Sequence, residues 1–171
     1  MILLILFSSS VLTQVADRFS EIKSFKCAFI ETLTVENDTF KFMGSVSIKK
    51  GKARIDVREP EKQIMIFVAD SVFIWIEKDK RIKRTRTPIS LSQLLFSPED
   101  YYKVDSINNR WVYISPLKLD STYPLSVQFN DDYFLKKIQF NQEGGKGKFT
   151  FYDYKINPEF PLTFFSINSI R

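Results

Sequence analysis

The chain is 171 residues long, 44% hydrophobic and 15% aromatic, and it carries a formal net charge of +5 at neutral pH. This length suits one domain with a substantial core. Because the sequence contains no histidine and a single cysteine, Cys27, it argues against zinc sites, histidine-dependent catalysis and an intrachain disulfide. We therefore expect no metal, no cofactor and no enzymatic activity.

The N-terminal residues have the pattern of a secretory signal peptide. An apolar run at 1–7 precedes three serines at 8–10, as the apolar core of a signal peptide precedes its small-residue exit. The run is too short to span a bilayer as a helix. We expect residues 1–9 to be a signal peptide, complete or truncated at its start, and residues 10–171 to form a single domain.

An amphipathic helix is predicted over 11–23, where apolar side chains recur every third or fourth position. These side chains are Val11, Leu12, Val15, Ala16, Phe19 and Ile22. After residue 24 the pattern changes to the period of two that is typical of strands. The clearest alternation covers 40–49, and a second alternating run at 53–57 follows a turn at Lys50-Gly51.

Two apolar runs at 64–69 and 72–76 predict a β-hairpin, because both are short and rich in β-branched and aromatic residues. Asp70-Ser71 separates them and favours a tight turn. Both runs are apolar at nearly every position, which indicates that both faces of this part of the sheet are covered. The periodicity leaves open which side chains share a face, since a slip of one residue exchanges the faces.

Six basic residues lie close together between Lys78 and Arg86. Such a run suits a nucleic-acid or anionic-lipid surface, or a solvated edge strand whose charges prevent pairing with another chain. We favour the edge strand. The runs at 103–107, 111–115, 125–130, 134–141, 148–155 and 162–167 also predict strands.

A short helix is predicted over 89–96, because Pro88 suits a first helical turn and Ser90 with Gln93 has the capping-box spacing. A helix of two turns needs an apolar surface to rest on. The sequence therefore predicts a mainly β protein with helices, in which a strongly curved antiparallel sheet forms an open, incomplete β-barrel. The N-terminal helix and the short lid helix would cover an apolar cavity suited to a lipid.

The order of these features resembles the periplasmic outer-membrane lipoprotein carrier family (LolA-like). The resemblance spans most of residues 10–115 and rests on several short motifs in order. They are Ile22-Lys-Ser-Phe-Lys-Cys-Ala-Phe29, Gly44-Ser-Val-Ser-Ile-Lys49, Ala53-Arg-Ile-Asp56, Pro60, Val68-Ala-Asp-Ser71 with Trp75, and Thr87-Pro88.

The resemblance implies an open β-barrel with a helical lid that receives acylated lipoproteins from an inner-membrane ABC transporter and passes them to an outer-membrane receptor. By position, the acyl-chain cavity would be lined by Phe40, Phe42, Val46, Ile48, Ala53, Ile55, Val57 and Trp75. Ile89, Leu91, Leu94 and Leu95 would form the lid. Lys50 stands where the family has a lid-latching arginine, and Ala53 stands where it usually has an aromatic residue.

We therefore expect a periplasmic monomer that carries lipoproteins and binds no nucleic acid. Three alternatives remain: an exported β-domain that binds or senses a glycolipid, a basic β-barrel that binds nucleic acid through 78–86, and a structural β-domain whose apolar residues are ordinary core. A carboxylate enzyme built on Asp100, Asp131 and Asp132 ranks last, because their spacing pairs none of them.

Overall fold

The computed structural model describes residues 2–49, 51–86, 95–117, 124–142 and 144–170, and these form one α-helix, eleven strands and two short 3-10 helices. The helices are α1 (Ile2–Ser20), η1 (Pro98–Asp100) and η2 (Ile167–Ile170). The strands are β1 (Ser24–Val35), β2 (Asp38–Lys49), β3 (Lys52–Glu59), β4 (Gln63–Val68), β5 (Ser71–Ile76), β6 (Arg81–Arg86), β7 (Tyr102–Asn108), β8 (Trp111–Pro116), β9 (Leu125–Phe129), β10 (Leu135–Gln142) and β11 (Gly145–Ile156).

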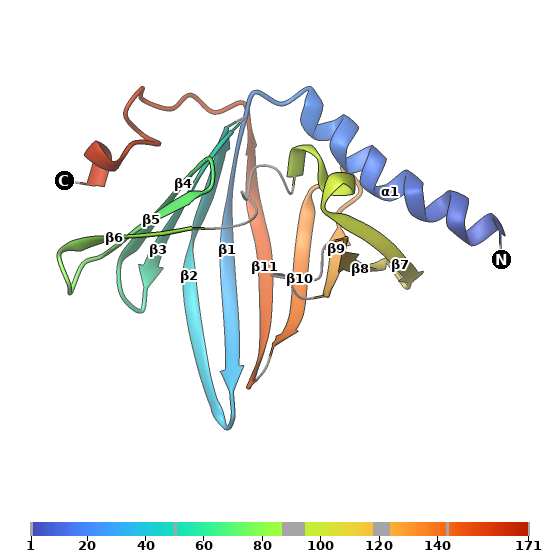
Figure 1. Cartoon of the computed structure of the whole chain (residues 1–171), viewed down its shortest axis with the longest axis horizontal. Helices are drawn as coiled ribbons and strands as arrows, with labels where there is room; N and C mark the ends of the chain where they lie inside the picture. Colours follow the sequence, from blue (N-terminus) through green and yellow to red (C-terminus); the bar gives the residue numbers. More distant parts are fainter. Residues whose placement is uncertain (1, 50, 87–94, 118–123, 143, 171) are drawn as a thin grey trace. The chain divides into compact units, whose positions relative to one another are not determined.

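The eleven strands of the described ranges form one sheet in the order β6-β5-β4-β3-β2-β1-β11-β10-β9-β8-β7 (Figure 1). The order does not close on itself, so β6 and β7 are edge strands. The predicted class, mainly β with an open antiparallel sheet, is confirmed. The edge-strand interpretation of the basic run is also confirmed, because β6 lies at a sheet edge. Among the described residues, no helix is both long enough and apolar enough to cross a membrane.

The chain divides into two compact units that share strands β1, β2 and β11. The first unit comprises Met1–Glu21, Glu31–Phe40 and Leu95–Phe151, and therefore holds α1 and strands β7 to β10. The second comprises Ile22–Ile30, Lys41–Leu94 and Tyr152–Arg171, and holds β3 to β6 with the C-terminal segment.

In the first unit, α1 packs through the apolar stripe that its sequence predicts, although the helix begins before residue 11 and ends at Ser20. Leu12, Val15 and Phe19 follow one another at the spacing of a helix face and are buried. The Phe19 ring meets Phe96 and Phe134 edge-on, at 5.8 Å between ring centres in each case. Edge-to-face contacts of this kind are favourable beyond the area they bury. These contacts fix the C-terminal half of α1, which also lies against β7 and η1.

The predicted hairpin is β4–β5, but its turn lies one residue earlier than expected. Val68 pairs with Ser71, so the turn residues are Ala69 and Asp70. Ala69 takes a positive φ of 52°, a left-handed conformation that tight hairpin turns require. The predicted turn at Asp70-Ser71 is wrong by one residue. Asp70-Ser71 is the stronger turn signal in the sequence, but the pairing of β4 with β5 sets the position of the turn.

The predicted strand at 162–167 is wrong. Residues 157–170 instead form turns and η2, in which backbone N–H groups of Phe164, Ser166 and Ser169 donate to carbonyls three residues earlier. Three aromatic rings in this segment pack on one another: Phe160 stacks on Phe164 at 4.7 Å, and Phe165 meets both edge-on. These turn hydrogen bonds and ring contacts stabilise the segment without pairing to a neighbouring strand.

Candidate functional site

The pairing of β2 to β5 assigns each side chain in the second unit to one of two faces. Val46 pairs with Ile55, Ile55 with Met65, and Met65 with Ile74, so these four share a side that we call face A. Ser47, Arg54, Ile66 and Phe73 are linked in the same way on the opposite side, which we call face B. Because side chains alternate along a strand, every other residue of β2 to β5 follows from these two rows.

Face A is apolar over four adjacent strands. In the paired rows of β2 to β5 from Gly44 to Ile76, Gln63 is the one polar side chain on this face. Its paired apolar side chains are Val46, Ile48, Ala53, Ile55, Val57, Met65, Phe67, Val72, Ile74 and Ile76. Alternation along β2 assigns Phe42 to the same face. Ile48 and Ala53 are fully buried, whereas Ile55, Met65 and Ile74 are partly exposed. The row from Val46 through Ile55 and Met65 to Ile74 therefore goes from core to a partly open apolar surface.

Gly44 brings β1 and β2 close together on face A. A Cβ at this position would collide with the backbone carbonyl of Asp56 and would lie 2.9 Å from two atoms of the Phe29 ring. The Phe29 ring therefore lies over Gly44, and Phe25 and Cys27 lie on the same side of β1.

Burial raises the pKa of the Cys27 thiol to about 12. Burial, and then the nearby Cys27, raise the pKa of Tyr154 to about 12. These groups are uncharged at neutral pH, so face A holds no charge here.

The residues predicted to line a cavity fall into three groups. Val46 and Ile48 on β2, and Ala53, Ile55 and Val57 on β3, lie together on face A, and alternation along β2 places Phe42 with them. Phe40 belongs to the first unit and is 47% exposed. Trp75 pairs with Ile64 and so lies on face B.

The predicted lid falls largely outside the described residues. Lys50, Ile89, Leu91 and Leu94 are among those that the structure does not describe. Leu95 is described: it is helical, partly exposed and part of the first unit.

Five face A residues were missed: Met65, Phe67, Val72, Ile74 and Ile76. Their strands are apolar on both sides, so alternation gave no signal. Assigning these residues to a face requires the register of the hairpin turn, because the register decides which of two neighbouring apolar side chains lies on which face.

Face B is covered by the C-terminal segment. Ile170 packs on Ile64 and Ile66, and Val68 and Trp75 join the same apolar cluster. Ile66 is fully buried as a result. This contact explains why β4 and β5 are apolar on face B as well as on face A.

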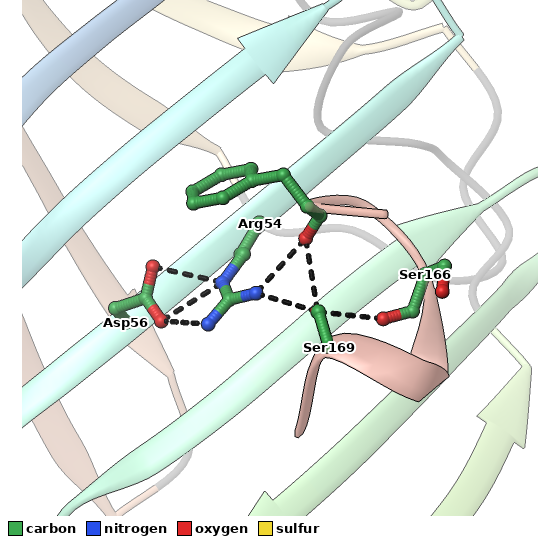
Figure 2. Close-up of polar contacts among 5 residues, drawn as sticks. Arg54, Asp56, Ser166 and Ser169 are labelled. Carbon is green, nitrogen blue, oxygen red and sulfur yellow. Dashed lines mark hydrogen bonds and ion pairs between the residues drawn. The ribbon is translucent and has the colours of Figure 1, made fainter. Parts of the chain in front are cut away.

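A buried arginine fastens the segment to β3 (Figure 2). The Arg54 guanidinium donates to both carboxylate oxygens of Asp56, at 2.8–3.0 Å, and the two side chains lie on the same face of the strand. Its Nη1 donates to the carbonyl of Phe164 at 2.9 Å and to Ser169 Oγ at 2.8 Å. The guanidinium also lies 4.5 Å from the centre of the Phe164 ring. Arginine suits this position because its planar fork can satisfy a carboxylate and further acceptors at once.

The first unit has an apolar face of its own on β8 to β11. Val112 pairs with Val127, Val127 with Ile138, and Ile138 with Phe149. Phe149 stacks on Phe140 at 6.2 Å and on Phe151 at 5.8 Å. The three rings are partly exposed. Phe140 lies directly over Gly147, where a Cβ would collide with the ring.

Within the described ranges, no three His, Cys, Asp or Glu side chains come together as metal ligands. Asp131 and Asp132 lie in the turn between β9 and β10, and Asp100 lies in η1. The described residues form two apolar surfaces on the sheet, face A and the aromatic face of β8 to β11.

Solved structures share this arrangement of elements. A LolA superfamily protein from Nitrosomonas europaea matches 95% of this chain and 98% of its own, with a TM-score of 0.59 and 11% identity. The chain has a LolA-like fold. A putative outer membrane lipoprotein-sorting protein domain from Vibrio parahaemolyticus matches 95% and 99%, with a TM-score of 0.56 and 12% identity.

The LolA-like fold also matches a DUF1329 family protein from Desulfovibrio piger, over 96% of this chain and 99% of the other, with a TM-score of 0.60 and 9% identity. No family model matches the chain, and no curated protein matches it by sequence. The resemblance inferred from short motifs is therefore confirmed for the fold. At identities this low, a structural likeness shows the fold alone and not the function.

Proposed function

We propose that the protein is a carrier that binds the acyl chains of a lipoprotein or lipid against face A. The observation that carries this proposal is the row Val46, Ile55, Met65 and Ile74, which runs apolar across four strands and becomes partly exposed toward β5. An acyl chain needs such a surface, because each methylene removed from water contributes about 0.8 kcal/mol.

The arrangement of face B supports the choice of face A. The C-terminal segment already occupies face B and is held there by the buried guanidinium of Arg54. A ligand that bound face B would have to displace this segment and break its hydrogen bonds. The paired rows of face A from Gly44 to Ile76 contain no charged side chain, so an acyl chain can pack there without stranding a buried charge.

The LolA-like fold is compatible with this function, and the Vibrio parahaemolyticus protein is described as a lipoprotein-sorting domain. We accordingly propose an exported, periplasmic carrier with acylated lipoproteins as cargo. An inner-membrane ABC transporter would load it, and an outer-membrane receptor would accept the cargo. Residues 89–95 would act as the lid, and binding rather than chemistry would be the activity.

The test places a charge in the centre of face A. Met65→Glu should weaken the binding of dansyl-labelled undecanoic acid and of a tripalmitoylated lipopeptide at least tenfold, because the carboxylate must be desolvated when the ligand packs on it. Lys49→Glu is the control, since Lys49 is exposed on face B of the same sheet. Circular dichroism confirms that both variants fold.

Equal binding by both variants would contradict the proposal, and so would wild-type protein that binds neither probe. Mass spectrometry of an organic extract of the protein purified from its native envelope identifies the cargo. A lipoprotein-derived acyl group supports lipoprotein transport. A glycolipid in its place would mean that the carrier serves a different lipid.

A further inference from the structure

Strand β6 and the turn before it concentrate nearly all of the chain's net charge. Between Glu77 and Arg86 there are six basic and two acidic residues, a net +4, against +5 for the whole chain. The basic residues are Lys78, Lys80, Arg81, Lys83, Arg84 and Arg86. All six side chains are exposed. Four lie on β6, which forms one edge of the sheet (Figure 1), and Lys78 and Lys80 lie in the turn before it.

The pairing of β5 with β6 places two of these charges at the end of face A. Ile76 pairs with Arg81 and Ile74 with Lys83, so two rows of face A each end in a cation at the sheet edge. Ile74 and Ile76 are partly exposed beside them. A basic border next to a partly open apolar surface matches the layering of a membrane, in which anionic headgroups lie above acyl chains.

Few of these charges are neutralised within the protein. Lys83 lies 3.4 Å from Asp79, and Arg86 lies 4.0 Å from Asp70. Arg84 donates to Ser71 Oγ and lies over the Phe73 ring. Among the described residues, Lys78, Lys80 and Arg81 form no ion pair. Charges on an edge strand prevent pairing with another chain, and the unpaired cations also leave this edge free to contact an anionic surface.

We propose that β6 and its turn are a docking surface for an anionic lipid bilayer. The proposal rests on the proposed function, because a carrier of acyl chains has to approach a membrane to receive or deliver them. Docking through β6 brings the end of face A to the headgroup layer, so an acyl chain can cross between bilayer and protein at the sheet edge. Ile82, which is 41% exposed and pairs with Trp75 on the face B side of β6, adds an apolar side chain to the same sheet edge.

Co-sedimentation with vesicles tests the docking surface. Wild-type protein should bind vesicles of phosphatidylglycerol and phosphatidylcholine at low salt, bind pure phosphatidylcholine weakly, and dissociate at high salt. The triple variant Lys80→Gln, Arg81→Gln and Lys83→Gln should lose on the order of a hundredfold in affinity, at about fivefold for each cation removed. The control variant Lys136→Gln, Lys146→Gln and Lys148→Gln has the same net charge and should lose less than about threefold.

Both triple variants should still bind dansyl-labelled undecanoic acid as the wild type does, which separates docking from acyl-chain binding. The docking proposal is overturned if the wild type ignores anionic vesicles, or if the two variants weaken vesicle binding equally. It is also overturned if a single-stranded oligonucleotide, and not vesicles, binds in a β6-dependent manner. Vesicle binding that depends on β6 in a protein that binds no acyl probe would refute the carrier function and leave β6 as a membrane-docking surface.

Discussion

Arg54 Nη1 donates a hydrogen bond of 2.8 Å to Ser169 Oγ, joining strand β3 to a residue 115 positions further along the chain. The same guanidinium holds the carboxylate of Asp56 and the carbonyl of Phe164. Because the Arg54 side chain is only 10% exposed, these acceptors take the place of water as partners of its positive charge. The contact therefore determines which face of β3 to β5 the protein covers with its own chain.

Replacing Arg54 should loosen the C-terminal segment. Arg54→Met leaves the Asp56 carboxylate and the Phe164 carbonyl without this donor, which should lower the free energy of unfolding by about 2–4 kcal/mol. Denaturant unfolding measures the change, and hydrogen exchange should show faster amide exchange in 160–170. Arg58→Met, at an exposed position of the same strand, should cost far less. Similar losses in the two variants would mean that the Arg54 contacts do not hold the segment.

Two buried serines, Ser47 and Ser24, should respond differently to replacement by alanine. Ser47 Oγ is buried and has no hydrogen-bond partner among the described residues, so Ser47→Ala should leave stability unchanged or raise it by up to about 1 kcal/mol. Ser24 Oγ donates to the Pro158 carbonyl at 2.7 Å, so Ser24→Ala should lose about 0.5–1.5 kcal/mol. Thermal unfolding of both variants checks this order, and a reversed order would contradict it.

Gly44 should tolerate no side chain. In Gly44→Ala the new methyl group would meet the Asp56 carbonyl and the Phe29 ring, and the resulting shift should cost about 1–3 kcal/mol. Urea unfolding gives the difference. Ser45→Ala, at the next position of β2, serves as the control because it removes an atom instead of adding one. A Gly44→Ala variant as stable as the control would show that β2 and β3 are less closely packed here.

Glu31 should make stability depend on pH. Burial raises the pKa of Glu31, so the folded chain holds this proton more tightly than the unfolded chain does. The carboxylate therefore destabilises the fold above the ordinary glutamate pKa, about 4.3, and the penalty disappears as the pH falls. Glu31→Gln should raise the Tm at about pH 7.5 but not at about pH 4. Glu21→Gln, at an exposed position, should change neither, and an equal rise at both pH values for Glu31→Gln would exclude titration as the cause.

The sequence was informative where a strand has one polar face. Val46 and Ile48 alternate with Ser45 and Ser47, so the period of β2 could be read directly and its apolar side was assigned consistently. Strands β4 and β5 are apolar on both sides, and Trp75 was grouped with the face A residues although its register places it on face B. Local patterns could not resolve this, because the turn register decides it.

The C-terminal segment could not be predicted because its partners are distant in sequence. Its alternating apolar residues suggested a strand, but the contacts of Arg54 with Phe164 and Ser169 join positions 110 and 115 residues apart. Nothing in the Ala53–Asp56 motif signals that its arginine is buried against another segment. Fold-level resemblance was recoverable from the order of short motifs, whereas the covering of face B was not.

Photo-crosslinking from face A tests the carrier proposal most directly. Benzoylphenylalanine placed at Ile74 lies on face A, and at the adjacent Phe73 it lies on face B. After illumination with a tripalmitoylated lipopeptide, the protein modified at position 74 should form the adduct through the acyl chains, and the protein modified at position 73 should not. Adducts from both positions, or from position 73 alone, would contradict acyl-chain binding on face A.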